Sequence, residues 1–254
     1  MGDFIPDVQV NGSLGDNLTA FISKRNFANF ALSNDMDPQT YKIYFNEGAI
    51  IITDSPDTLK GIPNLYYIGD DELQKSFNIL ATSEIFGKAM TFGLMCPDPR
   101  EIFLQFIENY TVIQAAGGLV INPQNQLLCI KRNGIWDLPK GKIEKYEDQR
   151  AAALREVMEE TGINRINISD KIGETYHAYH QDEAVLLKVT HWYKMNSKPD
   201  VNLKPQEEEG ITDVKFADLD WYHSSEFISY SSIHDIIKLG LDKFQESKEP
   251  AGQL

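Results

Sequence analysis

Hydrophobic positions follow no regular period at the start of the first 38 residues, a segment that begins with sequence rich in Gly, Asp, Pro and Asn. Residues 16–32 carry one apolar stripe at helical spacing, with Asp16 placed to cap the first turn. The turn-forming residues 34–37 and Pro38 then interrupt this pattern. We therefore expect residues 1–38 to form a mobile tail with a short helix.

The pattern of residues 39–110 predicts a small α+β domain. Apolar runs at 41–45 and 49–53 flank a turn that contains Gly48, as in a β-hairpin. The other elements expected here are a strand at 64–68 and helices at 70–79 and 97–109. No constellation of catalytic residue types occurs in this segment, so its expected role is structural or to cover a substrate.

From Thr111 onward, apolar β-branched runs alternate with two amphipathic stretches. The strands are expected at 112–121, 127–130, 185–193 and 214–216, and the helices at 147–161 and 232–244. Strands mixed with helices in one segment are typical of the α/β class. We predict an α/β sandwich domain over 111–244, followed by a tail at 245–254.

Composition narrows the function classes. The net charge of −14 argues against a general binder of nucleic-acid duplexes or of anionic membranes. No apolar run approaches the ~20 residues that span a bilayer, and the N-terminus lacks the basic and apolar pattern of a secretory signal. Two cysteines, Cys96 and Cys129, are too few for a four-thiolate zinc site or a disulfide framework. We expect reduced, buried thiols and a cytoplasmic protein.

Charge is distributed unevenly, however. Five basic residues stand between positions 131 and 145, against two acidic ones, Asp137 and Glu144. The basic residues are Lys131, Arg132, Lys140, Lys142 and Lys145. A local cationic region in an anionic protein indicates a site for a negatively charged ligand.

An acidic cluster lies in the helix predicted over 147–161. Glu156, Glu159 and Glu160 are three and four residues apart, so they are expected on one helix face, where like charges repel. Hard divalent cations such as Mg²⁺ prefer such oxygen ligands. For Glu159 and Glu160 taken alone, an ordinary solvated helix face remains the alternative interpretation.

The other face of this helix predicts packing against the sheet. Its apolar stripe is expected from Ala151, Leu154 and Met158, with Ala153 and Val157 beside them. The acidic residues would then point away from the core toward an open site. Gly162 follows as the expected C-terminal stop.

The whole stretch matches a known signature position by position. Gly141, five residues, Glu147, seven residues, Arg155-Glu156-Val157, one residue, Glu159-Glu160, one residue and Gly162-Ile163 resemble the motif of the Nudix family. The resemblance implies a Nudix-type α/β/α sandwich with a mixed sheet. It also implies a hydrolase that acts on nucleoside diphosphates linked to another group, by water attack at phosphorus with Mg²⁺ or Mn²⁺ assistance.

The same resemblance assigns roles to the motif residues. Glu156, Glu159 and Glu160 are expected as metal ligands, with Gly141 in the metal-binding loop. Glu147 would support the site, Arg155 would orient a glutamate, and Gly141 and Gly162 would shape the loops that flank the helix. The general base stays open between Glu159, Glu160 and the acidic run 207–209.

The residues before the motif point to a class of substrate. The stretch Trp136-Asp137-Leu138-Pro139-Lys140-Gly141-Lys142 resembles the Trp-x-x-Pro-Lys-Gly sequence that leads into the motif in some Nudix hydrolases. These are the hydrolases of dinucleoside polyphosphates, diphosphoinositol polyphosphates and capped RNA. Lys140, Lys142 and Arg132 offer counter-charge to a polyphosphate. Trp136 and Tyr193 are expected to contact the substrate through their aromatic rings, although inward packing is an equal alternative for Tyr193.

We therefore expect a small-molecule substrate, and the favoured candidate is a dinucleoside polyphosphate. An inositol pyrophosphate, an oxidised nucleotide or a sugar nucleotide is the alternative. A non-catalytic Nudix ligand sensor is disfavoured because the motif is intact. Neither a nucleic-acid duplex nor a membrane is expected as a partner, and a homodimer is left open.

Overall fold

The computed structural model describes residues 39–45, 48–62, 64–67, 91–108, 110–181, 184–198 and 202–246. The helices expected at 16–32 and 70–79 lie outside these residues. The described part belongs to one compact unit, Pro38–Leu254. None of its helices is long and apolar enough to cross a membrane.

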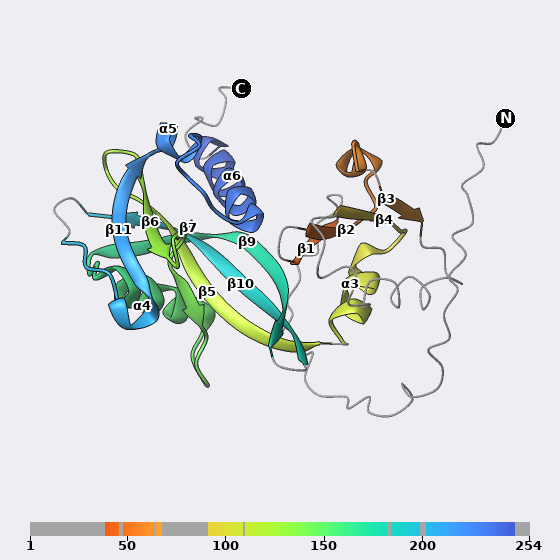
Figure 1. Ribbon diagram of the computed structural model, residues 1–254, viewed down its shortest axis with the longest axis horizontal. Helices are drawn as coiled ribbons and strands as arrows, with labels where there is room; N and C mark the ends of the chain where they lie inside the picture. The colour runs from red at the N-terminus through yellow and green to blue at the C-terminus, as the bar shows by residue number, and fades with distance from the viewer. Residues whose placement is uncertain are drawn as a thin grey trace, which may run out of the picture. The chain divides into compact units, whose positions relative to one another are not determined.

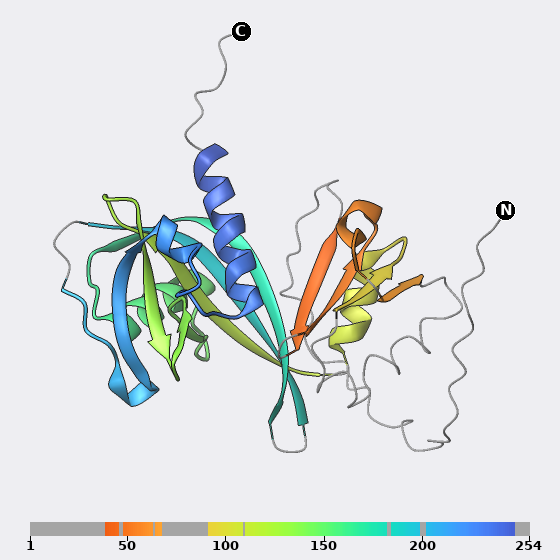
Figure 2. The same ribbon diagram turned by 45° about the horizontal axis from the view of Figure 1, so that its top comes forward.

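A mixed sheet runs through the described residues. Its strands follow the order β11-β6-β5-β10-β9-β1-β2-β4-β3, with β7 beside β6 and β8 beside β5. The strands of the C-terminal half are β5 (Thr111–Ile121), β6 (Gln126–Arg132), β7 (Ile135–Asp137), β8 (Lys140–Lys142), β9 (Ile166–Gln181), β10 (Ala184–Ser197) and β11 (Ile211–Asp218). Strands β5 and β10 are parallel, whereas β9 and β10 form a long antiparallel pair that curves through the domain (Figure 2).

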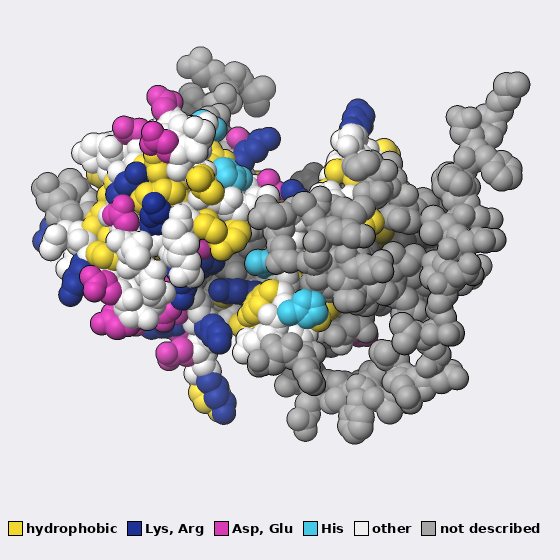
Figure 3. Space-filling model, viewed as in Figure 1, with side chains coloured by type: hydrophobic (Ala, Val, Ile, Leu, Met, Phe, Trp, Pro, Cys, Tyr) yellow, Lys and Arg dark blue, Asp and Glu magenta, His cyan; other side chains and the backbone are white. Residues whose placement is uncertain are grey.

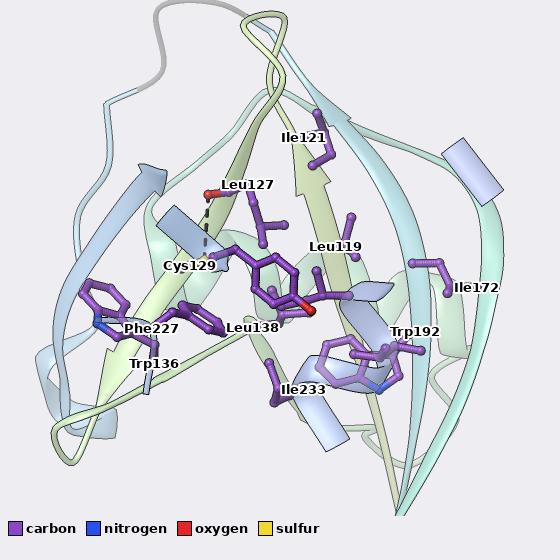
Figure 4. Packing of buried hydrophobic residues seen from close by; sticks show 13 residues of the cluster. Leu119, Ile121, Leu127, Cys129, Trp136, Leu138, Ile172, Trp192, Phe227 and Ile233 are labelled. Carbon is purple, nitrogen blue, oxygen red and sulfur yellow. Dashed lines mark hydrogen bonds between the residues drawn. The ribbon is translucent and has the colours of Figure 1, made fainter. Parts of the chain in front are cut away.

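Helices pack on both faces of this sheet (Figure 1). Helix α4 (Gln149–Thr161) packs Ala152, Ala153 and Val157 into one core cluster. On the other face, α6 (Ser231–Glu246) contributes Ile233, Ile236 and Ile237 to a second cluster, which also contains Trp192 and Leu119 (Figure 4). These two clusters confirm the predicted α/β class with a mixed sheet between helices.

The segment before Thr111 adds strands to the same sheet. It contains β1 (Thr40–Phe45), β2 (Gly48–Thr53), β3 (Asn64–Tyr67), β4 (Thr91–Met95), a 3₁₀ turn at Pro56–Leu59 and α3 (Pro99–Ile107). The predicted hairpin is confirmed, because β1 and β2 pair antiparallel. Strand β1 also pairs in parallel with β9 through Ile43–Tyr176 and Tyr44–His177. The ring of Phe103 stacks 4.3 Å from that of Tyr41 and lies 4.6 Å from that of Tyr176, centroid to centroid.

The predicted apolar stripe of the acidic helix is wrong in part. Ala151 is exposed and Met158 is 41% exposed, whereas Ala152, Ala153 and Val157 are buried. The packed face is the one that contains Ala153, Val157 and Glu160, spaced four and three residues apart. Each residue turns the helix by roughly 100°, so this spacing puts the three side chains on one side of the helix and Glu160 on the packed face.

Candidate active site

Local sequence sets the two ends of α4. The Asp148 side chain caps the first turn by accepting hydrogen bonds from the backbone N–H groups of Arg150 at 2.9 Å and Ala151 at 3.1 Å. Gly162 ends the helix in the left-handed region, with φ 72°, and its N–H donates to the Met158 carbonyl at 2.9 Å. This conformation favours glycine, which confirms the predicted stop.

Arg155 joins the acidic side chains of the motif. Its Nε and Nη2 donate to the two carboxylate oxygens of Glu147 at 2.8 and 2.9 Å. Its Nη1 donates to Glu156 Oε1 at 2.8 Å and to Glu159 Oε2 at 2.9 Å. Its Nη2 also donates to the Lys142 carbonyl at 2.9 Å, which ties the helix to β8. The hydrogen bonds to the glutamates raise the pKa of Arg155 and keep it charged, and those to Glu147 have the largest effect.

The pKa values of Glu147 and Glu156 are shifted in opposite directions. The hydrogen bonds from Arg155 lower the pKa of Glu147, which helps to keep it ionised. Burial raises the pKa of Glu156, although Arg155 opposes that effect. The Glu156 carboxylate lies against the Cα of Gly141: a Cβ built on Gly141 would stand 2.0 Å from Glu156 Oε2. Only glycine therefore leaves room for Glu156 in this position.

Glu160 differs from the other motif carboxylates because it is only 2% exposed. Its Oε2 accepts a hydrogen bond from the Lys140 N–H at 2.8 Å, and its Oε1 lies 3.7 Å from Arg132 Nη1. Burial raises the pKa of Glu160 to about 7. The expectation that all three glutamates point away from the core is therefore wrong for Glu160, since the helix turns it toward β8.

The donor chemistry of these side chains fits a divalent cation. Glu156 and Glu159 each place an oxygen within 2.9 Å of the same Arg155 nitrogen, so their carboxylates converge. All the oxygens offered are hard ligands of the kind that Mg²⁺ prefers. Within the described residues, no three acidic, thiol or imidazole side chains are grouped closely enough to hold a metal ion as they stand. Arg155 separates two of the glutamates, and Glu160 is turned toward Lys140, so binding requires the glutamates to rotate.

The predicted cationic residues lie close to this acidic cluster. Lys140 forms an ion pair with the buried Asp137 side chain. Arg132 contacts Glu209 at 2.8 Å, Nη2 to Oε2, in addition to its longer contact with Glu160. The Glu209 charge also raises the pKa of Glu156, so this member of the acidic run 207–209 lies near the motif helix. Lys142 remains exposed at the end of β8.

The two predicted aromatic contacts are largely buried. Trp136 is 6% exposed and packs in the α6-side cluster, where Lys215 Nζ lies 4.5 Å and Lys131 Nζ 5.4 Å from its ring centroid. Tyr193 is 4% exposed and its hydroxyl donates to Gln149 Oε1 at 3.2 Å. The structure thus places Tyr193 beside the first turn of α4 and Trp136 against the opposite helix layer.

Sequence reasoning missed Lys188, a half-buried residue of β10 that pairs with His177 on β9. Burial lowers the pKa of Lys188 to about 8, and Lys140 and Arg132 lower it further while Asp137 opposes them. Burial likewise lowers the pKa of His177, helped by Lys188 and Lys140. Lys188 interrupts the apolar run 185–189, and a lone lysine inside such a run is the sequence signal that could have drawn attention to it.

Comparison with known proteins identifies the domain that carries this site. Residues 112–235 match the model of the NUDIX domain family. Over 76 residues the chain is 42% identical to a protein of Bacillus subtilis named putative 8-oxo-dGTP diphosphatase. The aligned stretch covers 29% of this chain and 50% of that protein. An RNA pyrophosphohydrolase of Roseobacter denitrificans is 40% identical over 63 residues, 23% of this chain and 39% of the relative. The chain therefore spans half or less of the length of these curated relatives.

Solved structures are similar to part of the chain. A MutT protein from Methanosarcina mazei is 21% identical, with 55% of this chain and 98% of that one covered and a TM-score of 0.41. An Ap4A hydrolase from Caenorhabditis elegans is 20% identical, with 53% and 98% covered and a TM-score of 0.40. By the family model, residues 112–235 of this chain are a NUDIX domain.

Proposed function

We propose that this protein is a divalent-cation-dependent hydrolase of phosphoric anhydride bonds, and that its preferred substrate is a dinucleoside polyphosphate. The observation that carries the proposal is the arrangement around Arg155, which gathers Glu147, Glu156 and Glu159 on one side of α4. One guanidinium cannot neutralise three carboxylates, and the excess negative charge suits a bound divalent cation.

Each motif residue has a role in this proposal. Glu156, Glu159 and Glu160 would hold Mg²⁺ or Mn²⁺, which when bound neutralises phosphate charge and lowers the pKa of an attacking water. Arg155 positions Glu156 and Glu159, and Glu147 fixes Arg155 by a two-point contact. Gly141 leaves space for the Glu156 carboxylate. The general base is Glu159, Glu160 or a residue of the run 207–209, in which the charge of Glu209 raises the pKa of Glu156.

Basic residues next to the acidic cluster would bind the polyphosphate. The backbone N–H of Lys140 donates to Glu160, and the Arg132 guanidinium lies 3.7 Å from the same carboxylate. Lys142 is exposed two residues after Lys140. Lys188 adds a further charge close to Lys140. On the face shown in Figure 3, basic and acidic side chains of the described residues are interspersed. This surface suits a small anionic ligand better than a nucleic-acid duplex, which requires a continuous basic area.

The choice among substrates rests on chemistry and on the relatives. The names of the Bacillus and Roseobacter relatives refer to 8-oxo-dGTP and to RNA, which supports a nucleotide-linked substrate. The sequence 136–142 favours the dinucleoside class by its resemblance, and an oxidised nucleotide is the second candidate because of the Bacillus relative. The two free, buried thiols, Cys96 and Cys129, support the proposal that the protein acts in a reducing compartment such as the cytoplasm.

We also propose a domain boundary near residue 110. Helix α3 ends at Ile107, and the NUDIX match begins at residue 112. Residues 39–110 would form a small α+β domain whose strand β1 attaches to β9, and residues 111–244 would be the hydrolase domain.

A substrate panel tests the proposal. Diadenosine polyphosphates, 8-oxo-dGTP, a sugar nucleotide and a diphosphoinositol polyphosphate are incubated with protein and Mg²⁺, and the products are identified. We expect ATP or ADP from the dinucleoside substrates, with loss of nearly all turnover in Glu159→Gln. Glu108→Gln, which removes an exposed carboxylate at the end of α3, is the matched control and should keep the wild-type rate. Preferential cleavage of 8-oxo-dGTP would favour the second candidate, and cleavage of none of the compounds would refute the proposal.

A further inference from the structure

Tyr146 has an unusual combination of conformation and exposure. It lies in the loop between β8 and α4, one residue before Glu147. Its φ of 71° falls in the left-handed region, which strains a residue with a Cβ atom, and its side chain is 93% exposed. An exposed large aromatic group gains no burial energy in exchange for this strain. Strained backbone that packing does not reward is concentrated at functional sites.

The loop around Tyr146 is fixed to the proposed catalytic residues. The Glu147 N–H donates to the Glu144 carbonyl at 3.1 Å, and the Glu144 N–H donates to Glu147 Oε2 at 3.0 Å. Because Glu147 is also held by Arg155 at two points, the turn cannot relax without disturbing that ion pair. The Tyr146 ring is therefore presented to solvent by a rigid turn that ends at the acidic cluster.

Basic side chains accompany the exposed ring. Lys145 Nζ lies 5.0 Å from the Tyr146 ring centroid, and Lys142 is exposed three residues earlier. A rigid aromatic ring beside a lysine is the combination that binds a nucleoside phosphate, since the ring stacks on a base and the ammonium contacts a phosphate. A hydrophobic protein partner would instead be expected to meet a group of apolar residues, and the neighbours Lys145 and Glu147 are charged.

We propose that Tyr146 binds the nucleobase on the far side of the polyphosphate chain, so that a substrate with two bases is preferred to one with a single base. The proposal deepens the proposed function and rests on it. Stacking on Tyr146 would add contact area beyond the pyrophosphate, and Lys145 would contact the adjoining phosphate. This would make Tyr146 a specificity-determining residue with no part in the chemical step.

A pair of substrates of equal phosphate length isolates this contact. KM and kcat are measured for diadenosine tetraphosphate and for adenosine tetraphosphate with wild type, Tyr146→Phe, Tyr146→Gly and Leu239→Ala. We expect Tyr146→Gly to raise KM for the two-base substrate about tenfold more than KM for the one-base substrate, as loss of one stacked base predicts. Tyr146→Phe should retain most of the preference because it keeps a ring. Leu239→Ala removes a 43%-exposed residue of α6 and should match wild type.

Two readouts separate this inference from folding effects and from the proposed function. Glycine tolerates φ 71° without strain, so Tyr146→Gly should unfold at a temperature no lower than wild type. Calorimetric titration with a non-hydrolysable methylene-bridged dinucleoside polyphosphate measures binding without turnover, and Tyr146→Gly should bind it about tenfold more weakly. Failure of wild type to cleave either compound would refute the proposed function alone if this titration still shows the difference. Equal binding by wild type and Tyr146→Gly, or equal ratios of KM, would overturn the role of Tyr146.

Discussion

Arg155 and Glu147 make a two-point contact in which Nε and Nη2 of the guanidinium donate to the two carboxylate oxygens at 2.8 and 2.9 Å. Eight residues separate them in sequence, because Glu147 precedes α4 and Arg155 lies in its second turn. The contact leaves Nη1 free to hold Glu156 and Glu159. The position of two of the three proposed metal ligands, Glu156 and Glu159, thus depends on an ion pair formed by Arg155 and Glu147.

The first prediction concerns this ion pair. Arg155→Lys supplies one ammonium group, which cannot bridge Glu147, Glu156 and Glu159 in the same geometry. We expect kcat/KM to fall about 10- to 100-fold, the usual effect of losing a residue that orients metal ligands. The control is Arg165→Lys, an exposed residue beyond the end of α4. Equal losses in both variants would show that Arg155 has no special positioning role.

The second prediction uses the space beside Gly141. In Gly141→Ala the new Cβ would meet the Glu156 carboxylate, so Glu156 must move. A displacement of about 1 Å at such a position typically costs on the order of 100-fold in rate. Steady-state kinetics should show this loss while circular dichroism remains that of wild type. Gly173→Ala is the control, because its Cβ would meet only the ends of two flexible side chains, Leu239 Cδ2 at 3.3 Å and Ile236 Cδ1 at 4.0 Å. Full activity of Gly141→Ala would contradict the placement of Glu156.

The third prediction concerns a buried polar network away from the motif. Glu174 accepts hydrogen bonds from Lys171 and Tyr176 and contacts His191 Nδ1 at 2.9 Å. Burial alone would raise the pKa of Glu174, but these partners outweigh it and lower the pKa to about 2. Because the folded pKa lies below the unfolded value near 4.5, the stabilisation is complete above that value and is lost as pH falls toward 2.

Denaturant unfolding between pH 3 and pH 7 checks this expectation. Wild type should exceed Glu174→Gln by up to about 3 kcal/mol in free energy of unfolding at pH 7, and the difference should shrink steadily below pH 4.5. Glu108→Gln serves as an exposed control and should follow the wild-type curve. A difference between wild type and Glu174→Gln that does not change with pH would show that the network does not stabilise the ionised carboxylate.

The fourth prediction separates binding from stability at Lys188. Burial and the neighbouring cations penalise its charged form, so Lys188→Met should raise the free energy of unfolding at pH 7, by about 1–3 kcal/mol. The same variant should raise KM for a polyphosphate substrate because it removes a positive charge near Lys140. Thermal melts and initial rates measure the two effects. Greater stability with unchanged KM would exclude Lys188 from substrate binding.

Much of the fold is visible in the pattern of apolar residues, and the failures have physical causes. Strands β5, β6 and β10 carry long β-branched or apolar runs, and β11 carries the alternation Val214-Lys215-Phe216, so the pattern of apolar residues finds them. Strand β9 was missed because many of its residues are exposed or half-buried, as in Ser169-Asp170-Lys171. Such a strand is held by pairing with β10, a non-local contact that leaves little local signal.

The candidate site shows the same division. Spacing alone places the glutamates near one another, because helix geometry is regular. Spacing does not reveal that Glu160 is buried, since that depends on which face packs against β5 and β8. Lys188 lies on β10, whereas its charged neighbours Lys140 and Asp137 lie on β8 and β7, so only the folded chain brings Lys188 to that ion pair.

The binding of Mn²⁺, measured by calorimetric titration of wild type and of Glu156→Gln/Glu159→Gln, tests the central claim most directly. We expect wild type to bind Mn²⁺ and the double variant, shown to be folded by circular dichroism, to lose that binding. A correctly folded wild-type protein that binds neither Mn²⁺ nor Mg²⁺, or a double variant that binds them as tightly as wild type, would contradict the assignment of these glutamates.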